Sequence, residues 1–289
     1  MTITKRVDRQ VRFACANAPV HGAVEASLRT RIKTGRKCLV PFFTAGFPDA
    51  RRFASLLRAA EDQGCDAVEV GIPFSDPIAD GPAIQFASRC SLDAGNNVHT
   101  ILELLDRSRL QIPMILMGYL NPILTYGVRR FADDARATGV AGLIIPDLPC
   151  DFAAKSPGSS PLAEIGLGWL TQGFELTLLA APTSSAERLA QIGRTTCGFL
   201  YAVTVIGTTG VRQRLPRETN DFLRSARDAT TRPVLAGFGI ADASAARSVA
   251  AFCDGVVVGS ALIERMKTGS PGGAVKRVAE LLSKMRRAL

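Results

Sequence analysis

The chain has 289 residues, 47% of them hydrophobic, and a formal net charge of +9. This length suits one barrel domain of about 250 residues with extensions, or two smaller domains. No apolar stretch approaches the ~18 residues of a membrane span, and no finger, basic heptad or aromatic-rich RNA signature accompanies the charge, which disfavours a nucleic-acid-binding protein.

The positive charge is concentrated at the N-terminus. Residues 1–37 carry +7, whereas 38–289 keep only +2. We predict a basic, flexible extension over 1–22; a transit peptide is the alternative, which the scarcity of serine disfavours. The rest of the chain, 23–289, is predicted to form one domain that begins with a short helix at 23–33, ended by Gly35.

Eight apolar runs follow, nearly all succeeded by a segment with helical spacing. Their continuous rather than alternating apolarity is typical of parallel strands that are buried on both faces. The predicted strands are 38–46, 67–71, 113–119, 142–147, 176–182, 199–205, 233–239 and 255–261. The predicted helices are 48–63, 84–94, 98–109, 128–138, 186–192, 218–229, 243–251 and 273–287. This alternation predicts an α/β protein with a single (β/α)₈ TIM barrel.

One segment does not fit the alternation. Residues 151–173 should hold the fourth helix, but they contain Pro157, Gly158 and Pro161. Prolines inside a helix remove a hydrogen bond and clash with the preceding turn, so a long surface loop is predicted there.

The second predicted strand carries a carboxylate, Glu69, inside its apolar run. Burying a carboxylate is costly unless it is paired or used, so Glu69 is a candidate catalytic residue near the end of a barrel strand. Eleven residues later, Asp80 lies in a loop dense in Gly, Pro, Ser and Asp. The structural alternatives are that Glu69 is ion-paired inside the barrel and that Asp80 caps the next helix.

Glycine-rich turns follow three late strands, at 206–210, 237–239 and 259–261. Glycine lets backbone N–H groups approach phosphate oxygens, and loops after the seventh and eighth strands of such barrels often bind phosphate. These turns therefore indicate a phosphate site.

The sequence does not favour other kinds of catalytic site. With only His21 and His99, a histidine-based zinc site or catalytic triad is implausible, and no predicted strand interior holds the lysine that a Schiff-base aldolase needs. Seven cysteines without C-x-x-C spacing are typical of reduced thiols in a cytosolic protein, so a cytoplasmic location is expected.

Seven motifs together resemble those of the tryptophan synthase α-subunit family. They are VPFFTAGFPD (40–49), VEVGIPFSDPIADGPAIQ (68–85), MGYLNPI (117–123), GLIIPDLP (142–149), GTTG (207–210), GFGI (237–240) and GSAL (259–262). The resemblance runs from about residue 24 to the C-terminus, and GIPFSDPIADGP is its most specific part. It implies a TIM barrel that cleaves indole-3-glycerol phosphate to indole and glyceraldehyde 3-phosphate, in tryptophan biosynthesis.

The resemblance also implies roles for individual residues. Glu69 and Asp80 match the catalytic acid/base pair. The phosphate-binding positions match Gly210, Gly239, Gly259 and Ser260. The family's indole and glycerol pocket matches Phe42, Thr44, Met117, Tyr119, Ile144, Tyr201 and Thr209. The 1–22 extension, the proline-broken 151–173 segment and the loop VIGTTGVRQ depart from the family's pattern.

The retro-aldol reaction suits two carboxyl groups in different environments. One carboxyl with a pKa raised by an apolar strand can protonate indole C3 and take the proton of the neighbouring hydroxyl. A second carboxylate, ionised in a polar loop, can stabilise the charge on the ring nitrogen, so Glu69 and Asp80 suit a divided role. No metal or organic cofactor is expected in this chain.

The resemblance implies a pyridoxal-phosphate β-subunit as partner, in an α₂β₂ assembly. A free-standing indole-3-glycerol-phosphate lyase, a catalytically weak barrel that activates a partner, and another phosphate-sugar barrel enzyme are the alternatives. Neither a nucleic acid nor a membrane is an expected partner.

Overall fold

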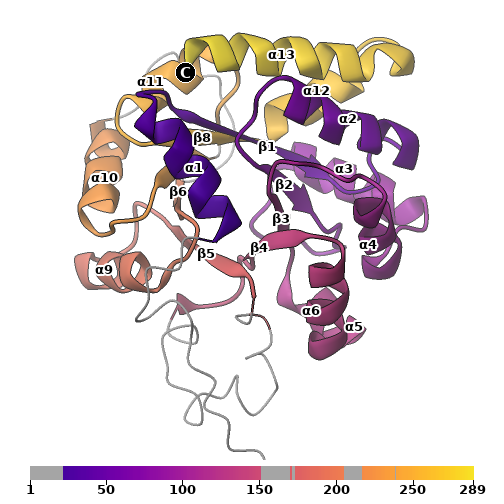
Figure 1. Cartoon of the computed structure of the whole chain (residues 1–289), viewed down its shortest axis with the longest axis horizontal. Helices are drawn as coiled ribbons and strands as arrows, with labels where there is room; N and C mark the ends of the chain where they lie inside the picture. The colour runs from indigo at the N-terminus through magenta and orange to yellow at the C-terminus, as the bar shows by residue number, and fades with distance from the viewer. Residues whose placement is uncertain (1–21, 151–169, 171–172, 205–216, 238) are drawn as a thin grey trace, which may run out of the picture.

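The chain folds into a closed barrel of eight parallel strands, each paired with its neighbour in sequence (Figure 1). The computed structural model describes residues 22–150, 170, 173–204, 217–237 and 239–289. The strands are β1 (Cys38–Thr44), β2 (Val68–Gly71), β3 (Met114–Met117), β4 (Val140–Ile144), β5 (Glu175–Ala180), β6 (Leu200–Val203), β7 (Val234–Gly237) and β8 (Gly255–Val258). The (β/α)₈ architecture and all eight predicted strands are confirmed.

Helices surround the strands (Figure 1). They are α1 (Ala23–Lys33), α2 (Ala50–Asp62), α3 (Pro82–Asp93), α4 (Val98–Asp106), α5 (Leu120–Tyr126), α6 (Val128–Ala137), α9 (Ala186–Thr195), α10 (Arg217–Asp228), α11 (Ala243–Ala250), α12 (Ser260–Lys267) and α13 (Ala274–Ala288). The residues that the helices bury are mainly apolar. In α2, for example, Phe53, Leu56, Leu57 and Ala60 share one buried face. The short helices α5 and α12 were not predicted.

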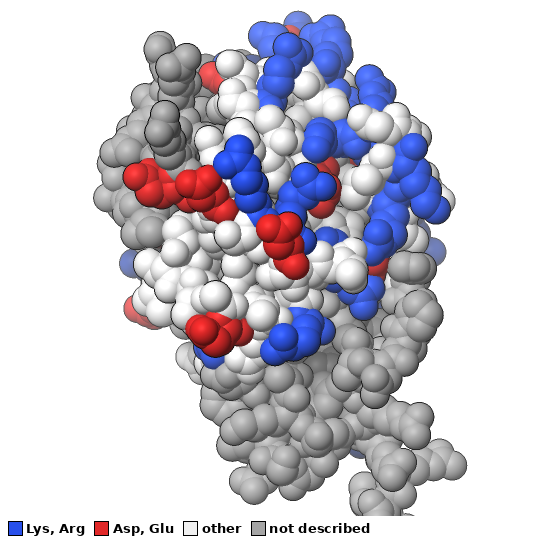
Figure 2. Space-filling view, turned by 90° about the vertical axis from the view of Figure 1, so that its left-hand side faces the viewer, with Lys and Arg blue, Asp and Glu red and all other residues white. Residues whose placement is uncertain are grey.

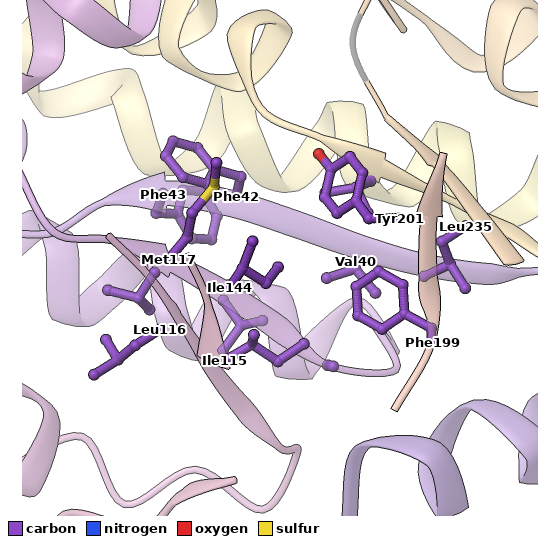
Figure 3. Close-up of a cluster of buried hydrophobic side chains, with 14 of the residues drawn as sticks. Val40, Phe42, Phe43, Ile115, Leu116, Met117, Ile144, Phe199, Tyr201 and Leu235 are labelled. Carbon is purple, nitrogen blue, oxygen red and sulfur yellow. The ribbon is translucent and has the colours of Figure 1, made fainter. Parts of the chain in front are cut away.

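The barrel interior is filled by apolar side chains from the strands. Figure 3 shows Phe42, Met117, Ile144 and Tyr201 within one such cluster. All four are at most 6% exposed. The strands therefore enclose a packed core, and chemistry is restricted to their ends and loops.

Helix α1 is fixed to the N-terminal ends of the strands. The Glu175 carboxylate, at the start of β5, accepts hydrogen bonds from the backbone N–H groups of Val24 and Glu25, at 2.7 and 3.0 Å. These N–H groups belong to the first turn of α1, where no intrahelical acceptor exists. A strand carboxylate thus caps a helix far away in sequence.

Charges of both signs cover the side of the molecule that holds α1, α9, α10 and α11. Figure 2 shows Lys and Arg side chains gathered there, interrupted by Asp and Glu. On α10, Arg224 and Asp221 form an exposed ion pair of this kind. The interruption agrees with the argument against a nucleic-acid surface.

Several predictions concern residues outside the described part of the chain. These are the flexible extension at 1–22, apart from its last residue, most of the predicted loop at 151–173, and the turn at 206–210. Across the described helices, none combines the length and apolar character that crossing a membrane requires. The prediction of reduced thiols is wrong for Cys197, which is disulfide-bonded, whereas Cys38, Cys65, Cys90, Cys150 and Cys253 are in no disulfide.

Candidate active site

Glu69 lies on β2 and faces the barrel interior. Its residue pairs in register with Phe42 of β1 and Ile115 of β3, and its side chain is fully buried. Among the described residues, neither carboxyl oxygen has a hydrogen-bond partner, and no ion pair forms with this group. Glu69 is therefore not ion-paired with any described residue, and the structural alternative for it is wrong within that part of the chain.

Burial sets the protonation of Glu69. Desolvation, aided by repulsion from Asp80, raises its pKa from 4.5 to about 8. Burial penalises the charged form because the interior solvates it poorly. The carboxyl group consequently carries its proton at neutral pH and can act as an acid.

Asp80 lies in the loop between β2 and α3. The N-cap of α3 is Gly81, whose position forms no side-chain cap hydrogen bond, so the helix-cap alternative for Asp80 is wrong. Burial raises the Asp80 pKa from 3.8 to about 6, and a hydrogen bond with the Tyr119 hydroxyl opposes this shift. Asp80 is therefore mostly ionised at neutral pH, unlike Glu69.

Tyr119, just after β3, holds the loop that carries Asp80. Its hydroxyl accepts a hydrogen bond from the Ala79 N–H at 2.9 Å. Its ring packs on Phe74, at the start of the same loop, with 5.1 Å between ring centroids. Tyr119 thus contacts both ends of the segment that positions the second carboxylate.

A pocket connects Asp80 with the C-terminal ends of β1, β2 and β3. Its lining residues are Phe42, Gly71, Ile72, Asp80, Ile84, Ser88, Met117, Gly118 and Tyr119. The walls are mainly apolar, with one carboxyl and two hydroxyl groups as polar members. An apolar lining with a few polar groups is typical of small-molecule sites.

The structure brings four predicted residues into this pocket: Phe42, Asp80, Met117 and Tyr119. Gly71 leaves room for the Phe42 ring, since a Cβ there would lie 2.4 Å from Phe42 Cζ. Glu69 does not line the pocket, and neither do Thr44, Ile144 and Tyr201. Thr44 and Ile144 are buried at the ends of β1 and β4, and Tyr201 is buried within β6.

Tyr201 interacts electrostatically with both carboxyl groups. Its burial, together with the charges of Glu69 and Asp80, raises the pKa of its hydroxyl well above the ordinary value. A Cβ at Gly237 would lie 2.3 Å from that hydroxyl, so the glycine makes room for it. The tyrosine is consequently a neutral polar group close to both carboxyls.

The predicted phosphate residues lie after β7 and β8. Gly239 has φ +78°, a left-handed conformation that favours glycine. Gly259 is the N-cap of α12 and Ser260 its first residue, and Ser260 is exposed. The first turn of a helix presents free N–H groups and a positive dipole end, which favour an anion. Thr209 and Gly210 lie outside the described residues.

Five lining residues were not predicted: Gly71, Ile72, Ile84, Ser88 and Gly118. Ile84 and Ser88 are one turn apart on α3, so they share a face. Pro82 marks where α3 begins, shortly after Asp80, but it does not indicate which face of the helix lies against the loop that carries Asp80.

Known proteins resemble this chain over nearly its whole length. The family model described as tryptophan synthase alpha chain matches residues 28–289. The alpha chain of Prochlorococcus marinus (strain MIT 9313) is 37% identical over 279 residues, covering 96% of this chain and 98% of that relative. The alpha chain of Synechococcus elongatus is 41% identical over 267 residues, covering 91% and 94%.

Solved structures agree with the sequence comparison. Tryptophan synthase subunit alpha from Legionella pneumophila superposes with a TM-score of 0.80 at 32% identity, covering 93% of this chain and 98% of that one. A chain of Mycobacterium tuberculosis tryptophan synthase also gives 0.80, at 29% identity, with 93% and 98% covered. The chain therefore belongs to the tryptophan synthase alpha chain family, whose reaction is the retro-aldol cleavage of indole-3-glycerol phosphate in tryptophan biosynthesis.

Proposed function

We propose that Glu69 performs both proton transfers of this lyase reaction. The observation that carries the proposal is the fully buried carboxyl of Glu69 on β2, which lacks hydrogen-bond partners among the described residues. A carboxyl kept protonated by burial is a competent acid at neutral pH, and it becomes a base once its proton has left.

The two transfers follow in order. Glu69 first protonates C3 of the indole ring, which places a positive charge on the ring nitrogen. The resulting carboxylate then takes the proton of the adjacent glycerol hydroxyl. The O–H electron pair forms the aldehyde C=O bond, and the pair of the broken C–C bond returns to the ring and neutralises the nitrogen. Glu69 ends protonated, ready for the next cycle.

Asp80 supports the charge that appears on the ring nitrogen. An ionised carboxylate in the loop beside the pocket stabilises a cationic N–H and can accept its proton, since its pKa of about 6 keeps it ionised at pH 7. The different environments of Glu69 and Asp80 divide the roles of acid and charge stabiliser between two similar groups.

The remaining predicted residues bind the substrate. Phe42, Met117 and Tyr119 hold the indole ring, with Ile144, Tyr201, Thr44 and Thr209 around the reacting carbons. The phosphate is bound by backbone N–H groups at Gly239, Gly259 and Gly210 and by Ser260. The contact between Gly239 and phosphate is supported by its position after β7, one strand from the α12 N-terminus.

This chain works without its own cofactor, with pyridoxal phosphate held by a β-subunit in an α₂β₂ assembly in the cytoplasm. No group of three His, Cys, Asp or Glu side chains within the described ranges is arranged to hold a metal.

Ile78, in the loop that carries Asp80, is 88% exposed, and an exposed apolar side chain there suits a partner surface. The domain limits, an extension at 1–22 and a barrel at 23–289, belong to the same proposal.

An indole-release assay tests the proposal. The isolated chain should cleave indole-3-glycerol phosphate slowly, and a tryptophan synthase β-subunit should raise kcat by more than about tenfold, which corresponds to about 1.4 kcal/mol. Fast turnover alone, with no complex in sedimentation, would instead favour the free-standing lyase. An isolated chain that is inactive with and without the partner would indicate the weak, activating barrel.

A further inference from the structure

Thr44, the last residue of β1, is a buried polar residue whose hydroxyl has no partner in the part of the chain that the structure describes. Its side chain is 1% exposed, and its hydroxyl forms no hydrogen bond with any described residue. A buried hydroxyl that makes no hydrogen bond lowers folding stability, because its hydrogen bonds to water are lost without replacement. A buried hydroxyl without a hydrogen bond therefore calls for a functional explanation.

Other buried hydroxyls in this barrel are satisfied. Thr177, on β5, donates to the Cys197 carbonyl at 3.0 Å, and Ser91 donates to the Ala45 carbonyl at 2.6 Å. Thr196 donates to the Phe199 carbonyl at 2.6 Å. The fold can therefore provide acceptors for buried hydroxyls, and Thr44 differs from these residues.

Strand geometry places Thr44 and Glu69 on the same side of neighbouring strands. In the register of β1 and β2, Phe42 pairs with Glu69 and Thr44 pairs with Gly71. Successive side chains of a strand alternate, so Thr44 points to the same side as Phe42, which overlies Gly71 and lines the pocket. Thr44 and Glu69 are thus diagonal neighbours that face the interior, and neither satisfies the other.

We propose a specific role for Thr44 within the substrate pocket: its hydroxyl donates a hydrogen bond to the glycerol oxygen that loses its proton to Glu69. This inference rests on the proposed role of Glu69. As that proton leaves, negative charge develops on the oxygen before the C=O bond is complete. A donor positioned at this oxygen stabilises the charge and orients the O–H toward the carboxylate. The substrate oxygen would satisfy both unpartnered groups.

Thr44→Val tests the inference, because valine keeps the shape and removes only the hydroxyl. We expect kcat/KM for indole release to fall by at least about tenfold, most of it in kcat. The urea midpoint of unfolding should stay equal or rise, since an unsatisfied buried hydroxyl has been removed. Thr44→Ser, which keeps the hydroxyl, should restore most of the activity.

Thr177→Val is the matched control. It removes a buried hydroxyl of the same residue type that is satisfied within the protein, so it should lower the unfolding midpoint and leave kinetics unchanged. A Thr44→Val enzyme with normal kcat/KM would overturn the inference. So would a loss that Thr44→Ser does not restore and that accompanies a lowered midpoint, because that pattern indicates packing.

A second comparison separates this inference from the role of Glu69. If Glu69→Gln is inactive while Thr44→Val is normal, only the Thr44 inference fails. If Glu69→Gln is fully active, the proposed function fails as well. When both hold, Thr44→Val added to Glu69→Gln should cause little further loss, because both groups act on the same oxygen.

Discussion

Two buried carboxyl groups, one just before β2 and one within it, have very different surroundings. Asp66, just before the strand, is 4% exposed and accepts hydrogen bonds from Arg31 at 2.6 Å and Arg286 at 3.0 Å. The Leu39 N–H donates to it as well, at 2.8 Å. Glu69, three residues later, is fully buried and has no such partner among the described residues.

The same contrast, between carboxylates with partners and polar groups without described partners, holds for other buried residues of the barrel. At the N-terminal end, the buried carboxylate of Glu25 pairs with Arg29 and Arg232, and Glu175 caps α1. Further along the strands, Glu69 within β2 and Thr44 at the end of β1 are buried with polar atoms that have no described partner. The satisfied groups stabilise the attachment of α1 and α13, whereas the unsatisfied ones are available to a substrate.

Replacing the unpartnered carboxylate should give the largest effect on activity. Glu69→Gln cannot transfer protons, so kcat for indole release should fall by at least the ~10²–10⁴ of general acid–base catalysis. Substrate binding, followed by KM or by an inhibitor titration, should change little. Retention of more than about a tenth of wild-type kcat would show that Glu69 is not the acid/base.

The same variant should be stabilised, most strongly at alkaline pH. The Glu69 pKa is about 8 in the folded chain against 4.5 for an unperturbed group, so the folded state keeps a proton that the unfolded state releases between these pH values. Stability from this group is therefore lost as pH rises, by up to about 1.4 kcal/mol per unit. The gain of Glu69→Gln in urea midpoint should be small at pH 5 and clear at pH 8.

Replacing Asp66, the carboxylate that has partners, should lower stability and leave activity unchanged. Asp66→Asn breaks a buried network with Arg31 and Arg286, which should destabilise the fold by about 3–5 kcal/mol. Its kcat and KM should remain normal at temperatures where the protein is folded, since Asp66 lies at the N-terminal end of β2 and the pocket at the C-terminal ends of the strands. A stable Asp66→Asn with impaired turnover would contradict the division between the two carboxyl groups.

Asp80→Asn should reduce activity and alter its pH dependence. Wild-type turnover requires ionised Asp80 and protonated Glu69, so we expect a bell-shaped profile with limbs near pH 6 and pH 8. The variant should lose most activity and the acidic limb. Its alkaline limb should move to lower pH, because repulsion from Asp80 contributes to the raised pKa of Glu69. A variant close to wild type would remove Asp80 from the mechanism.

Gly259→Val should act on binding with a smaller effect. A Cβ there would lie 3.2 Å from Phe42 Cδ1 and would crowd the N-terminus of α12. KM for indole-3-glycerol phosphate should rise, and inhibition by glycerol phosphates should weaken in parallel. Gly272→Ala is the control, because a Cβ at that position has no heavy atom within 4 Å. An unchanged KM in folded Gly259→Val would move the phosphate site elsewhere.

The sequence predicted the strands well because parallel strands buried on both faces are continuous apolar runs. It missed α12 because Ser260 and Ala261 follow β8 so closely that they were counted in its strand. It missed α5, a seven-residue helix with Pro122 inside it, because proline argues against helix. Short elements at strand ends are decided by tertiary contacts rather than by periodicity.

For the candidate site, the position of Glu69 in an apolar strand was sufficient to predict a buried carboxyl group there. Its lack of partners was not predictable, because that depends on which charged side chains distant in sequence reach the same space. The alternative roles of Asp80 were resolved by Gly81, which takes the N-cap position of α3. The contributions of Ile84 and Ser88 depend on how α3 is oriented against the barrel, which sequence spacing alone does not specify.

The central claim is that burial without partners keeps Glu69 protonated at neutral pH. Carbon-13 NMR of glutamate carboxyls, with Glu69→Gln to assign the signal, measures this directly. The account predicts one resonance, absent from the variant, that titrates near pH 8. A Glu69 signal that titrates at the ordinary value of about 4.3 would contradict it, because the group would then be ionised and could not supply the first proton.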